Sequence, residues 1–490
     1  QNILDKVDAV SEADAEWTGP YLDPENAARR NDRIYTTKGG FLRDLAEVDP
    51  AEFGVMPSMA DGGDPDHLLA LKHARDALAD AGYLNKPFNR ERAGIVLGRG
   101  TYSNRGQANV LFHGMFLDQA MDIVRKVRPD LSEDEIAELR AGFKKQLPPY
   151  SGEMVGPLTP NVITGMIANR LDLMGPNYIV DAACASSLIA VAQAAEELSS
   201  GRCDLMLTGG VHAQTPPQLY IQFCQIQALS RSRIRPFQKG ANGTLLGEGV
   251  GVMALKRLAD AERDGDRIYA VIKGIGIASD GKAKGLLTPR LEGEVLAVKR
   301  AYESSGIDPA SIGLIEAHGT GTPVGDRAEA KTITESLQAE GAAPKSCAIG
   351  SVKTLLGHTK ASAGVSGLIK VALSLYHRTL PAHYGVDKPI DAIADANSPV
   401  YLLKDNRPWL AHPDHPRRGG VSAFGFGGTN FHAVLEEYRG DFAAPAAPGS
   451  TQWPYELFLF RAKDEAALNA DLGRMVTALR QGTNLKLRDL

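Results

Sequence analysis

Residues 180–192 read VDAACASSLIAVA, and this stretch decides the fold. The apolar run at 178–180 predicts a buried strand, and the Ala- and Leu-rich sequence after Asp181 has helical spacing to about Ser200. Cys184 is therefore expected on the turn where a strand becomes a helix. The free N–H groups and the positive dipole end of a helix N-terminus favour a thiolate. We therefore expect a lowered pKa and a nucleophilic role for Cys184, with a small buried hydrophobe as the alternative.

Three later stretches combine glycine with histidine or threonine. They read EAHGTGTP at 316–323, KTLLGHT at 353–359 and SAFGFGGTN at 422–430. Together with the Cys184 stretch they stand in the order found in the β-ketoacyl synthases, and the chain resembles that family from about residue 2 to residue 438. The resemblance implies an α/β protein with the thiolase-like fold, in which two duplicated α/β halves form a five-layered αβαβα sandwich.

The sequence itself carries a faint sign of this duplication. The helix and strand expected at 77–98 are echoed at 301–316, and the helix after Cys184 is echoed at 367–372. We therefore expect an N-terminal ketosynthase half at 1–257, which carries the nucleophile, and a C-terminal half at 258–438, which carries two catalytic histidines.

Residues 439–490 differ in composition from the rest. The segment AAPAAPGS at 443–450 is a linker by composition, and a strand at 456–460 and a helix at 464–480 are expected after it. This part resembles the start of the linker that joins ketosynthase to acyltransferase in modular synthases. The family's usual first apolar strand is also absent from the start, so we expect the chain to be part of a longer polypeptide.

The resemblance assigns catalytic roles to five residues. Cys184 would hold the growing acyl chain, and His318 and His358 would donate hydrogen bonds to the thioester oxygen of the extender unit. Lys353 and Glu329 match the family's lysine and glutamate, and their implied role is to orient and tune the histidine site. The alternative for this charged pair is two ordinary charges on helix surfaces.

The resemblance also implies an oxyanion hole and a substrate-binding surface. The backbone N–H groups of Cys184 and Phe426 would hold the oxyanion, because the glycines around Phe426 let the backbone approach a reacting carbonyl. Ordinary turn chemistry and an aromatic core are the alternatives for the threonines and phenylalanines of the binding surface. The predicted substrate-binding residues are Thr320 and Thr322 toward the phosphopantetheine arm, Phe237 and Phe426 as walls of an acyl tunnel, and Gly427 and Gly428.

The predicted function is chain elongation. An acyl group would be transferred to Cys184 and then joined to a malonyl-type extender on an acyl carrier protein by decarboxylative Claisen condensation, in polyketide or polyunsaturated fatty acid biosynthesis. The domain would bind no cofactor, because its substrates arrive as phosphopantetheine thioesters. The expected partners are an acyl carrier protein domain, a neighbouring acyltransferase domain and a second copy of the chain in a homodimer.

Four alternatives predict different residues. A non-condensing subunit that only binds carrier protein would replace the cysteine and lose a histidine, whereas this chain keeps all three. A thiolase would place a second cysteine near the C-terminal glycine turn, where this chain has Asn430. A cysteine hydrolase needs one histidine as base, which leaves the other without a role. A zinc site made by Cys184, His318 and His358 has no supporting spacing.

Two departures from the family pattern concern substrate range. Gln238 and Asn242 stand where the family usually has aspartates, and the nucleophile motif reads DAACASS at 181–187. The second form, preceded by IANRLDL at 167–173, is similar to synthases of polyunsaturated fatty acids and related iterative systems. Neither departure touches a predicted catalytic residue.

Composition limits the remaining possibilities. The chain has 490 residues, of which 43% are hydrophobic and 23% charged, and its net charge of -5 gives no reason to expect nucleic acid or an anionic membrane as partner. No apolar stretch reaches the roughly 18 residues that a membrane span needs. The four cysteines lie far apart without a CxxC pair, so we expect reduced thiols, no metal site and a cytoplasmic location.

Overall fold

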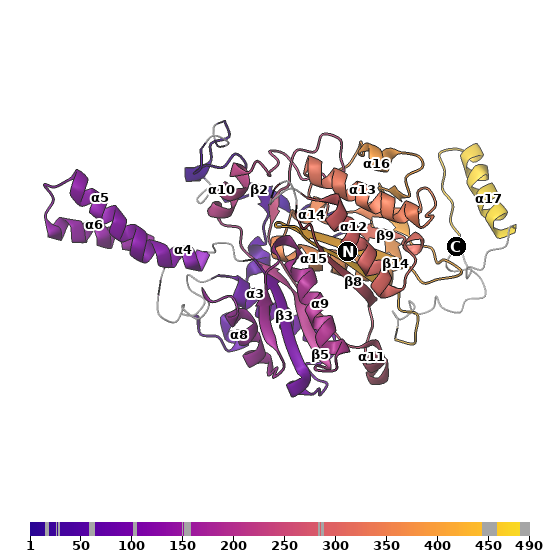
Figure 1. Ribbon diagram of the computed structural model, residues 1–490, viewed down its shortest axis with the longest axis horizontal. Helices are drawn as coiled ribbons and strands as arrows, with labels where there is room; N and C mark the ends of the chain where they lie inside the picture. Colours follow the sequence, from indigo (N-terminus) through magenta and orange to yellow (C-terminus); the bar gives the residue numbers. More distant parts are fainter. Residues whose placement is uncertain are drawn as a thin grey trace.

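Two β-sheets divide the protein into layers (Figure 1). The computed structural model describes residues 1–14, 19–25, 27, 30–57, 64–100, 105–148, 150, 158–282, 285, 289–442 and 458–480. The first sheet has the order β4-β3-β5-β7, with β4 Asn177–Val180, β3 Ala93–Arg99, β5 Leu205–His212 and β7 Gly249–Leu255. The second has the order β12-β10-β9-β14-β15-β8, with β12 Val400–Tyr401, β10 Cys347–Gly350, β9 Leu314–Glu316, β14 Arg418–Gly425, β15 Thr429–Glu436 and β8 Val271–Ser279.

The two sheets repeat one arrangement. In the first, β4, β3 and β5 run parallel and β7 is antiparallel to β5. In the second, β10, β9 and β14 run parallel and β15 is antiparallel to β14. A long helix leaves the equivalent strand in each: α9 Ser186–Ser199 follows β4, and α15 Ala363–Tyr376 follows β10. The predicted duplication of two α/β halves is confirmed.

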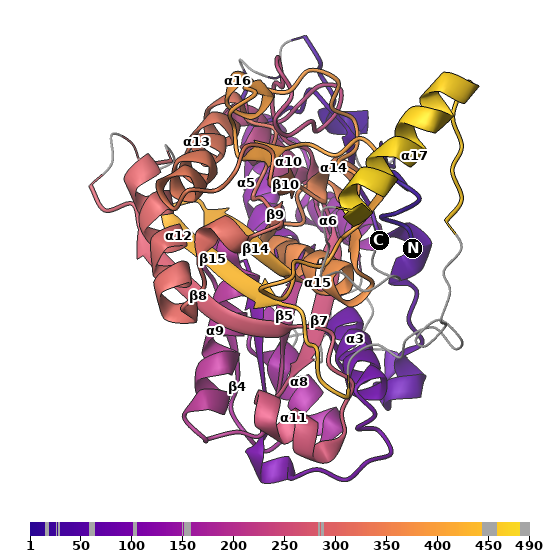
Figure 2. The same ribbon diagram turned by 90° about the vertical axis from the view of Figure 1, so that its right-hand side faces the viewer.

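Helices form the other three layers (Figure 2). On one outer face, α3 Asp66–Asp80 and α8 Val162–Leu171 pack on the first sheet. Between the sheets lie α9 and α15, and on the far face α12 Leu291–Ser305 and α13 Pro323–Ala339 cover the second sheet. The predicted five-layered thiolase-like sandwich is therefore confirmed.

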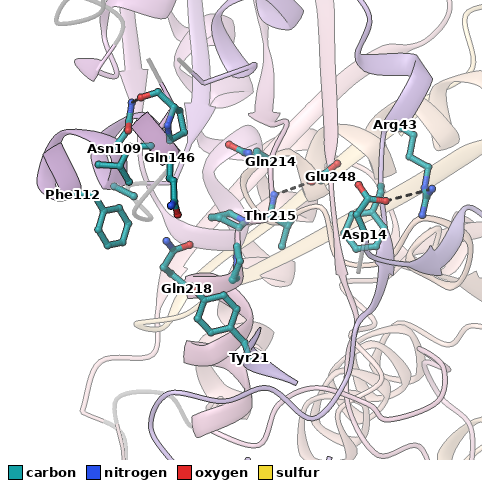
Figure 3. Close-up of a pocket in the computed structure, with 16 residues that line it drawn as sticks. Asp14, Tyr21, Arg43, Asn109, Phe112, Gln146, Gln214, Thr215, Gln218 and Glu248 are labelled. Carbon is teal, nitrogen blue, oxygen red and sulfur yellow. Dashed lines mark hydrogen bonds and ion pairs between the residues drawn. The ribbon is translucent and has the colours of Figure 1, made fainter. Parts of the chain in front are cut away.

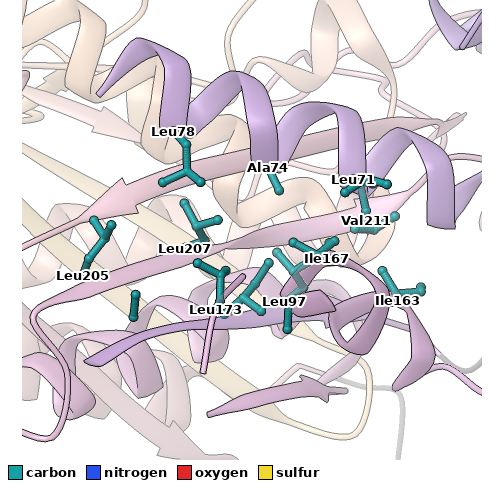
Figure 4. Close-up of a cluster of buried hydrophobic side chains, with 14 of the residues drawn as sticks. Leu71, Ala74, Leu78, Leu97, Ile163, Ile167, Leu173, Leu205, Leu207 and Val211 are labelled. Carbon is teal, nitrogen blue, oxygen red and sulfur yellow. The ribbon is translucent and has the colours of Figure 1, made fainter. Parts of the chain in front are cut away.

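Each interface between layers has its own apolar core. The one between the first sheet and its outer helices joins Leu71 and Leu78 of α3, Ile163 of α8, and Leu97 and Leu207 of the strands (Figure 4). The strands β3 and β5 are buried at every position, as expected for parallel strands covered on both faces. A second core joins the apolar sides of α9 and α15 to β14 and β15.

An arm extends from this body (Figure 1). It consists of α4 Arg105–Leu111, a π-helix at Phe112–Phe116, α5 Leu117–Val127 and α6 Glu133–Gln146. Ser132 and Glu135 form the capping box at the start of α6 that the sequence predicts. The arm has a small core of its own, made by Leu117, Met121 and Ile136.

Further strands and helices complete the fold. They are β1 Val10–Glu12 and β2 Lys38–Gly40, which pair with each other; β6 Leu246–Gly247, which pairs with β2; the pair β11 Thr379–Leu380 and β13 Arg407–Pro408; and the helices α10 Pro217–Gln225, α11 Leu258–Asp264, α14 Lys353–Leu356, α16 Asp391–Ala394 and α17 Glu465–Arg480.

Of the elements predicted near the C-terminus, the helix is confirmed and the strand is not. The helix expected at 464–480 is α17. The strand expected at 456–460 is wrong for residues 458–460, which are not in a strand, and its first two residues lie outside the described part. The linker at 443–450 also lies outside it. Within the described ranges, no helix combines the length and apolar character needed to cross a membrane.

Candidate active site

Cys184 lies on a tight turn between β4 and α9. A 3-10 turn at Ala183–Ala185 separates the strand from the helix, and Ala183 adopts a φ of +50°. Two contacts hold this turn: the Ala183 N–H donates to Asp181 Oδ1 at 2.8 Å, and the Ala182 N–H donates to Ser186 Oγ at 2.9 Å. The predicted position at a strand-to-helix turn is correct, but Cys184 precedes the first residue of the α-helix by two positions.

Glycines bring the strands against this turn. A Cβ at Gly98 of β3 would lie 2.4 Å from the carbonyl carbon of Ser186. On the neighbouring strand, a Cβ at Gly210 would lie 2.7 Å from the carbonyl oxygen of Ala361, near the start of α15. Both contacts are with backbone atoms, so only glycine allows the two helix starts to meet the end of the first sheet.

The pKa of Cys184 differs from the sequence-based expectation. Burial raises the pKa of the thiol above its ordinary value, and the positive charges of Lys360 and Lys353 and a hydrogen bond from the Phe426 backbone oppose that shift. The side chain is only 3% exposed, so desolvation of the thiolate outweighs the helix N-terminus. The expectation of a lowered pKa is therefore wrong.

His358 is held as a neutral hydrogen-bond donor. Burial first, and then the charges of Lys360 and Lys353, hold the pKa of its imidazole well below the ordinary value. The Lys360 backbone N–H donates to His358 Nδ1 at 3.1 Å. Because Nδ1 accepts this bond, the proton of the neutral ring resides on Nε2, which is left to donate.

His318 lies beside His358. The two ring centroids are 5.4 Å apart and nearly perpendicular. Burial, together with the charges of Lys353 and Lys360, holds the pKa of His318 well below its ordinary value. Its Nδ1 is buried and has no hydrogen-bond partner among the described residues. Both histidines and Cys184 thus share the same two charged neighbours, and the structure brings the three together.

Glu329 and Lys353 are buried, not on helix surfaces. The Glu329 carboxylate accepts the backbone N–H of His318 at 2.6 Å and that of Gly319 at 2.7 Å, so α13 fixes the loop that carries His318. Burial raises the pKa of Glu329 to about 7. Burial lowers the pKa of Lys353, and the carboxylates of Glu316 and Glu329 oppose that shift. The alternative of two ordinary charges on helix surfaces is therefore wrong, whereas the orienting role stays a prediction.

The Phe426 turn faces the nucleophile. It joins β14 to β15, and a Cβ at Gly425 would lie 2.5 Å from the carbonyl oxygen of Ala182. Gly427 and Gly428 adopt φ angles of +91° and +78°, which favour glycine. The backbone of Phe426 hydrogen-bonds Cys184, whereas its ring is 41% exposed. This geometry fits an oxyanion donor at the mouth of the site.

The remaining predicted substrate residues divide into two groups. Thr320 and Thr322 are half-buried, and their Oγ1 atoms lie 2.9 Å apart in the loop after His318. Phe237 is fully buried in the apolar cluster of α12 and α13, with Val298 as one neighbour. This position agrees with the aromatic-core alternative, and a role of Phe237 in an acyl tunnel stays a prediction.

Two residues of the site were not identified from the sequence. Asp326 accepts the N–H of Gly321 at 3.0 Å and that of Phe237 at 2.8 Å, and so orders the threonine loop. Lys360 is completely buried and lies against the ring of Phe223. The available signal for Lys360 was its position directly before the run of small and apolar residues at 361–365.

A cavity of about 690 Å³ lies near the base of the arm (Figure 3). Glu248 lies on its wall and accepts the N–H of Thr215 at 2.8 Å and that of Leu42 at 3.0 Å. None of the predicted site residues lines this cavity. Within the described ranges, no three His, Cys, Asp or Glu side chains are placed to hold a metal ion.

The fold, with its two facing helix starts, is that of the thiolase-like proteins. A family model described as Beta-ketoacyl synthase, N-terminal domain, matches residues 1–261, and one described as Beta-ketoacyl synthase, C-terminal domain, matches residues 269–387. The chain therefore belongs to the β-ketoacyl synthase family, enzymes that transfer acyl groups and form carbon–carbon bonds.

Related proteins agree with this assignment. The chain is 36% identical over 95% of its length to a polyunsaturated fatty acid synthase protein of Thraustochytrium sp., and 34% identical over 91% of its length to polyketide synthase PksN of Bacillus subtilis. It spans only 17% and 8% of those two proteins. The ketosynthase from module 6 of the Bacillus subtilis bacillaene synthase has a TM-score of 0.74 and 31% identity, covering 99% of this chain and 74% of that one. The Streptomyces albus oxazolomycin ketosynthase domain has a TM-score of 0.75 and 28% identity, covering 98% and 77%.

Proposed function

We propose that this chain elongates carrier-bound acyl chains through a covalent intermediate on Cys184. The observation that supports this most directly is the grouping of one buried thiol with two neutral imidazoles and a backbone donor from Phe426. A thiolate attacks the incoming acyl thioester, and the N–H groups of Cys184 and Phe426 hold the tetrahedral oxyanion. The new thioester is similar in energy to the old one, so the transfer is readily reversible.

The histidines serve the second half-reaction. Loss of carbon dioxide from a malonyl-type extender leaves an enolate, whose oxygen carries the developing charge. His358 donates from Nε2, and His318 supplies a second hydrogen bond from the adjacent ring. Since both rings are neutral, they stabilise the enolate without trapping it as a permanent ion pair. The enolate carbon then attacks the acyl group on Cys184.

The substrate and its carrier follow from this chemistry. We place the phosphopantetheine arm along Thr320 and Thr322, and the acyl thioester beside Gly427 and Gly428, because these lie on the loops that flank the histidines and Phe426. The domain needs no cofactor of its own for either step. The acyl group belongs to a polyketide or polyunsaturated fatty acid pathway, as the names of the relatives suggest.

The partners and the domain limits are part of the same proposal. Because the curated relatives are far longer than this chain, an acyl carrier protein domain and an acyltransferase domain are expected in the same polypeptide. We divide the chain into halves at 1–257 and 258–438, followed by a linker at 439–490, and expect it to work as a homodimer. All four cysteines are free and buried, which fits a reducing, cytoplasmic setting.

Covalent loading tests the proposal. The chain is incubated with an acyl thioester and its intact mass is measured; the wild-type protein should gain one acyl group, and Cys184→Ala should gain none. Cys203→Ala is the matched control, because Cys203 is equally buried but belongs to the core between α9 and the first sheet. Acylation of Cys184→Ala would show that another residue is the nucleophile.

A second measurement separates the two half-reactions. His358→Ala should still become acylated, but release of carbon dioxide from a malonyl thioester should fall by about 100-fold, the usual effect of losing one donor to a developing oxyanion. An unchanged decarboxylation rate would remove His358 from the proposed mechanism.

A further inference from the structure

Lys360 occupies a position that the duplication of the fold relates to Cys184. In the first half, the 3-10 turn Ala183–Ala185 leads into α9; in the second, the 3-10 turn Lys360–Ser362 leads into α15. The first residue of each turn has the same unusual backbone, with φ of +50° at Ala183 and +51° at Lys360. The two turns contact each other. Lys360 is therefore the second-half equivalent of the residue next to the nucleophile, and it faces the nucleophile turn.

The Lys360 side chain is buried without an anionic partner. It is 0% exposed, and Nζ has no hydrogen-bond partner among the described residues. Lys370 provides the contrast, because it is also buried but lies 2.5 Å from a carboxylate oxygen of Glu316. An isolated buried ammonium is costly, and such a group readily exchanges its proton.

Aromatic contacts connect Lys360 to the reacting sulfur. Nζ lies 3.7 Å from the centroid of the Phe223 ring, which supports the amine when it is charged. The Phe223 ring stacks on that of Phe426 at 5.8 Å, and the Phe426 backbone hydrogen-bonds Cys184. Of the charged groups that lower the pKa of Cys184, Lys360 has the largest effect.

We propose that Lys360 provides the positive counter-charge of the Cys184 thiolate, an inference that depends on the proposed role of Cys184 as nucleophile. The turn that carries Lys360 contacts the turn that carries Cys184, so a protonated Nζ lies near the negative charge that forms when the thiol loses its proton to solvent. Acyl transfer then converts the thiolate into an uncharged thioester, and the thiolate of the departing carrier takes up a proton from solvent.

The neighbouring histidines carry no charge that would compete with Lys360. The groups that interact with Lys360 or Cys184 are His212, His318, His358, Lys353 and Asp181. All three histidines have a lowered pKa, chiefly because of burial, and so remain neutral near pH 7. Burial lowers the pKa of Lys360 to about 7, with the Cys184 thiolate opposing that shift. The amine is therefore partly protonated at neutral pH, and its charge can stabilise the thiolate.

The test is the pH profile of Cys184 alkylation, followed by peptide mass spectrometry after treatment with iodoacetamide. Lys360→Met should raise the apparent pKa of Cys184 by about one unit and slow labelling at pH 7 by about 10-fold. Lys360→Arg keeps a permanent charge and should shift the apparent pKa in the opposite direction. Lys299→Met, on an exposed face of α12, is the control and should leave the profile unchanged.

The outcomes separate this inference from the proposed function. Opposite shifts in the Met and Arg variants support Lys360, because a purely structural role would not reverse sign with charge. A wild-type profile in Lys360→Met would overturn the inference and leave Cys184 as the nucleophile. Acyl loading of wild-type protein on another residue would instead overturn the proposed function. If Lys360→Met does not fold, Lys360→Gln in the same assay decides, and its profile must show the upward shift.

Discussion

Glu329 offers the most direct test of a positioning role in the candidate site. Both oxygens of its carboxylate accept N–H groups of the His318 loop, at 2.6 and 2.7 Å. Glu329→Gln keeps the shape but replaces one acceptor oxygen by an NH2 group, which cannot accept the backbone N–H that faces it. We expect a loss of about 2 kcal/mol in the free energy of unfolding, as for a buried hydrogen bond to a charged group, measured by urea denaturation.

The same variant should separate the two half-reactions. Acyl loading of Cys184 should persist, whereas decarboxylation should fall because His318 is no longer fixed. Glu335→Gln is the matched control on the same helix, since Glu335 is exposed and forms an ion pair with Lys331 at 3.6 Å. Its effect should stay within about 0.5 kcal/mol. Equal losses in both variants would contradict the role of Glu329.

At the residue scale, the sequence and the family pattern selected residues that lie close together but did not reveal their electrostatics. The pattern located Cys184, His318 and His358, which the structure brings together. It did not reveal that burial would raise the pKa of Cys184, because desolvation depends on what packs around a side chain rather than on its neighbours in sequence. Lys360 was missed for the same reason, since a lysine is ordinarily a surface residue.

At the scale of elements, the start of α9 depends on close contact with β3. The backbone of Ser186 and Ser187 lies so near Gly98 that an added Cβ would come within 2.5 Å of three backbone atoms. We expect Gly98→Ala to destabilise the protein by about 2 kcal/mol or more through overpacking and to reduce acyl loading, because the Cys184 turn must move with the helix. Calorimetry and intact-mass loading measure the two effects.

A glycine in an open position is the control for this change. Gly165 lies within α8, and its nearest contact for an added Cβ is Asn177 Oδ1 at 3.9 Å. Gly165→Ala should therefore be neutral or slightly stabilising, because alanine is the better helix former. If Gly98→Ala were equally well tolerated, the close approach of strand and helix would not be what positions Cys184.

The sequence predicted a strand or a helix start where one local pattern was sufficient. The predicted strand before Cys184 is β4, but the expectation that it is buried is wrong, because β4 lies at the edge of the first sheet. Ser132 with Glu135 predicted the start of α6. The positive φ of Ala183 was not predictable, because alanine carries no signal for that conformation and tertiary contacts impose it. The direction of the arm was equally hidden, since periodicity describes a helix but not its placement.

At the scale of the whole molecule, the duplication brings the start of α9 and the start of α15 to the same place. In each half a 3-10 turn leads directly into a long helix, and the two helices pack side by side between the sheets. The Ser187 hydroxyl of α9 accepts the N–H of Val365 in α15 at 3.0 Å, which fixes the two starts together. The first half thus supplies Cys184, and the second supplies His318, His358 and Lys360.

Six of the eight histidines with a lowered pKa lie deep in the protein and make the stability of the whole fold depend on pH. Burial lowers the pKa of His67 and His432 to about 4 and of His212 and His383 to about 3, and holds those of His318 and His358 well below the ordinary value. Because these rings bind protons less well when folded, the stability they contribute is present above pH 6.5 and is lost as the pH falls through the folded values.

Buried carboxyl groups make the stability of the fold depend on pH in the opposite direction. Burial raises the pKa of Glu294 to about 8 and those of Asp326 and Glu329 to about 7. Their contribution is present below about pH 4 and is lost as the pH rises through 7 to 8. Between pH 4.5 and 6.5 the six histidines outweigh these three groups, so we expect the free energy of unfolding to rise with pH across that interval.

His432 allows this expectation to be tested at one position. The ring is 0% exposed, lies 5.5 Å from that of Tyr302, and owes its lowered pKa to burial alone. His432→Phe should flatten the rise in unfolding free energy between pH 4.5 and 6.5 by up to about 1.4 kcal/mol per pH unit, the value for one proton. Urea denaturation at pH 4.5, 5.5 and 6.5 measures it.

Ser422→Ala controls for the loss of a contact, because it removes the 2.9 Å hydrogen bond between Ser422 Oγ and His432 Nδ1 but keeps the titrating ring. It should lower stability at every pH and leave the slope nearly unchanged. A slope that stays at the wild-type value in His432→Phe would mean that His432 binds protons equally in the folded and unfolded chain. In that case the histidines of the core could not be the cause of acid sensitivity, and the buried ion pairs, such as Arg417 with Glu437 at 2.7 Å, would have to account for it.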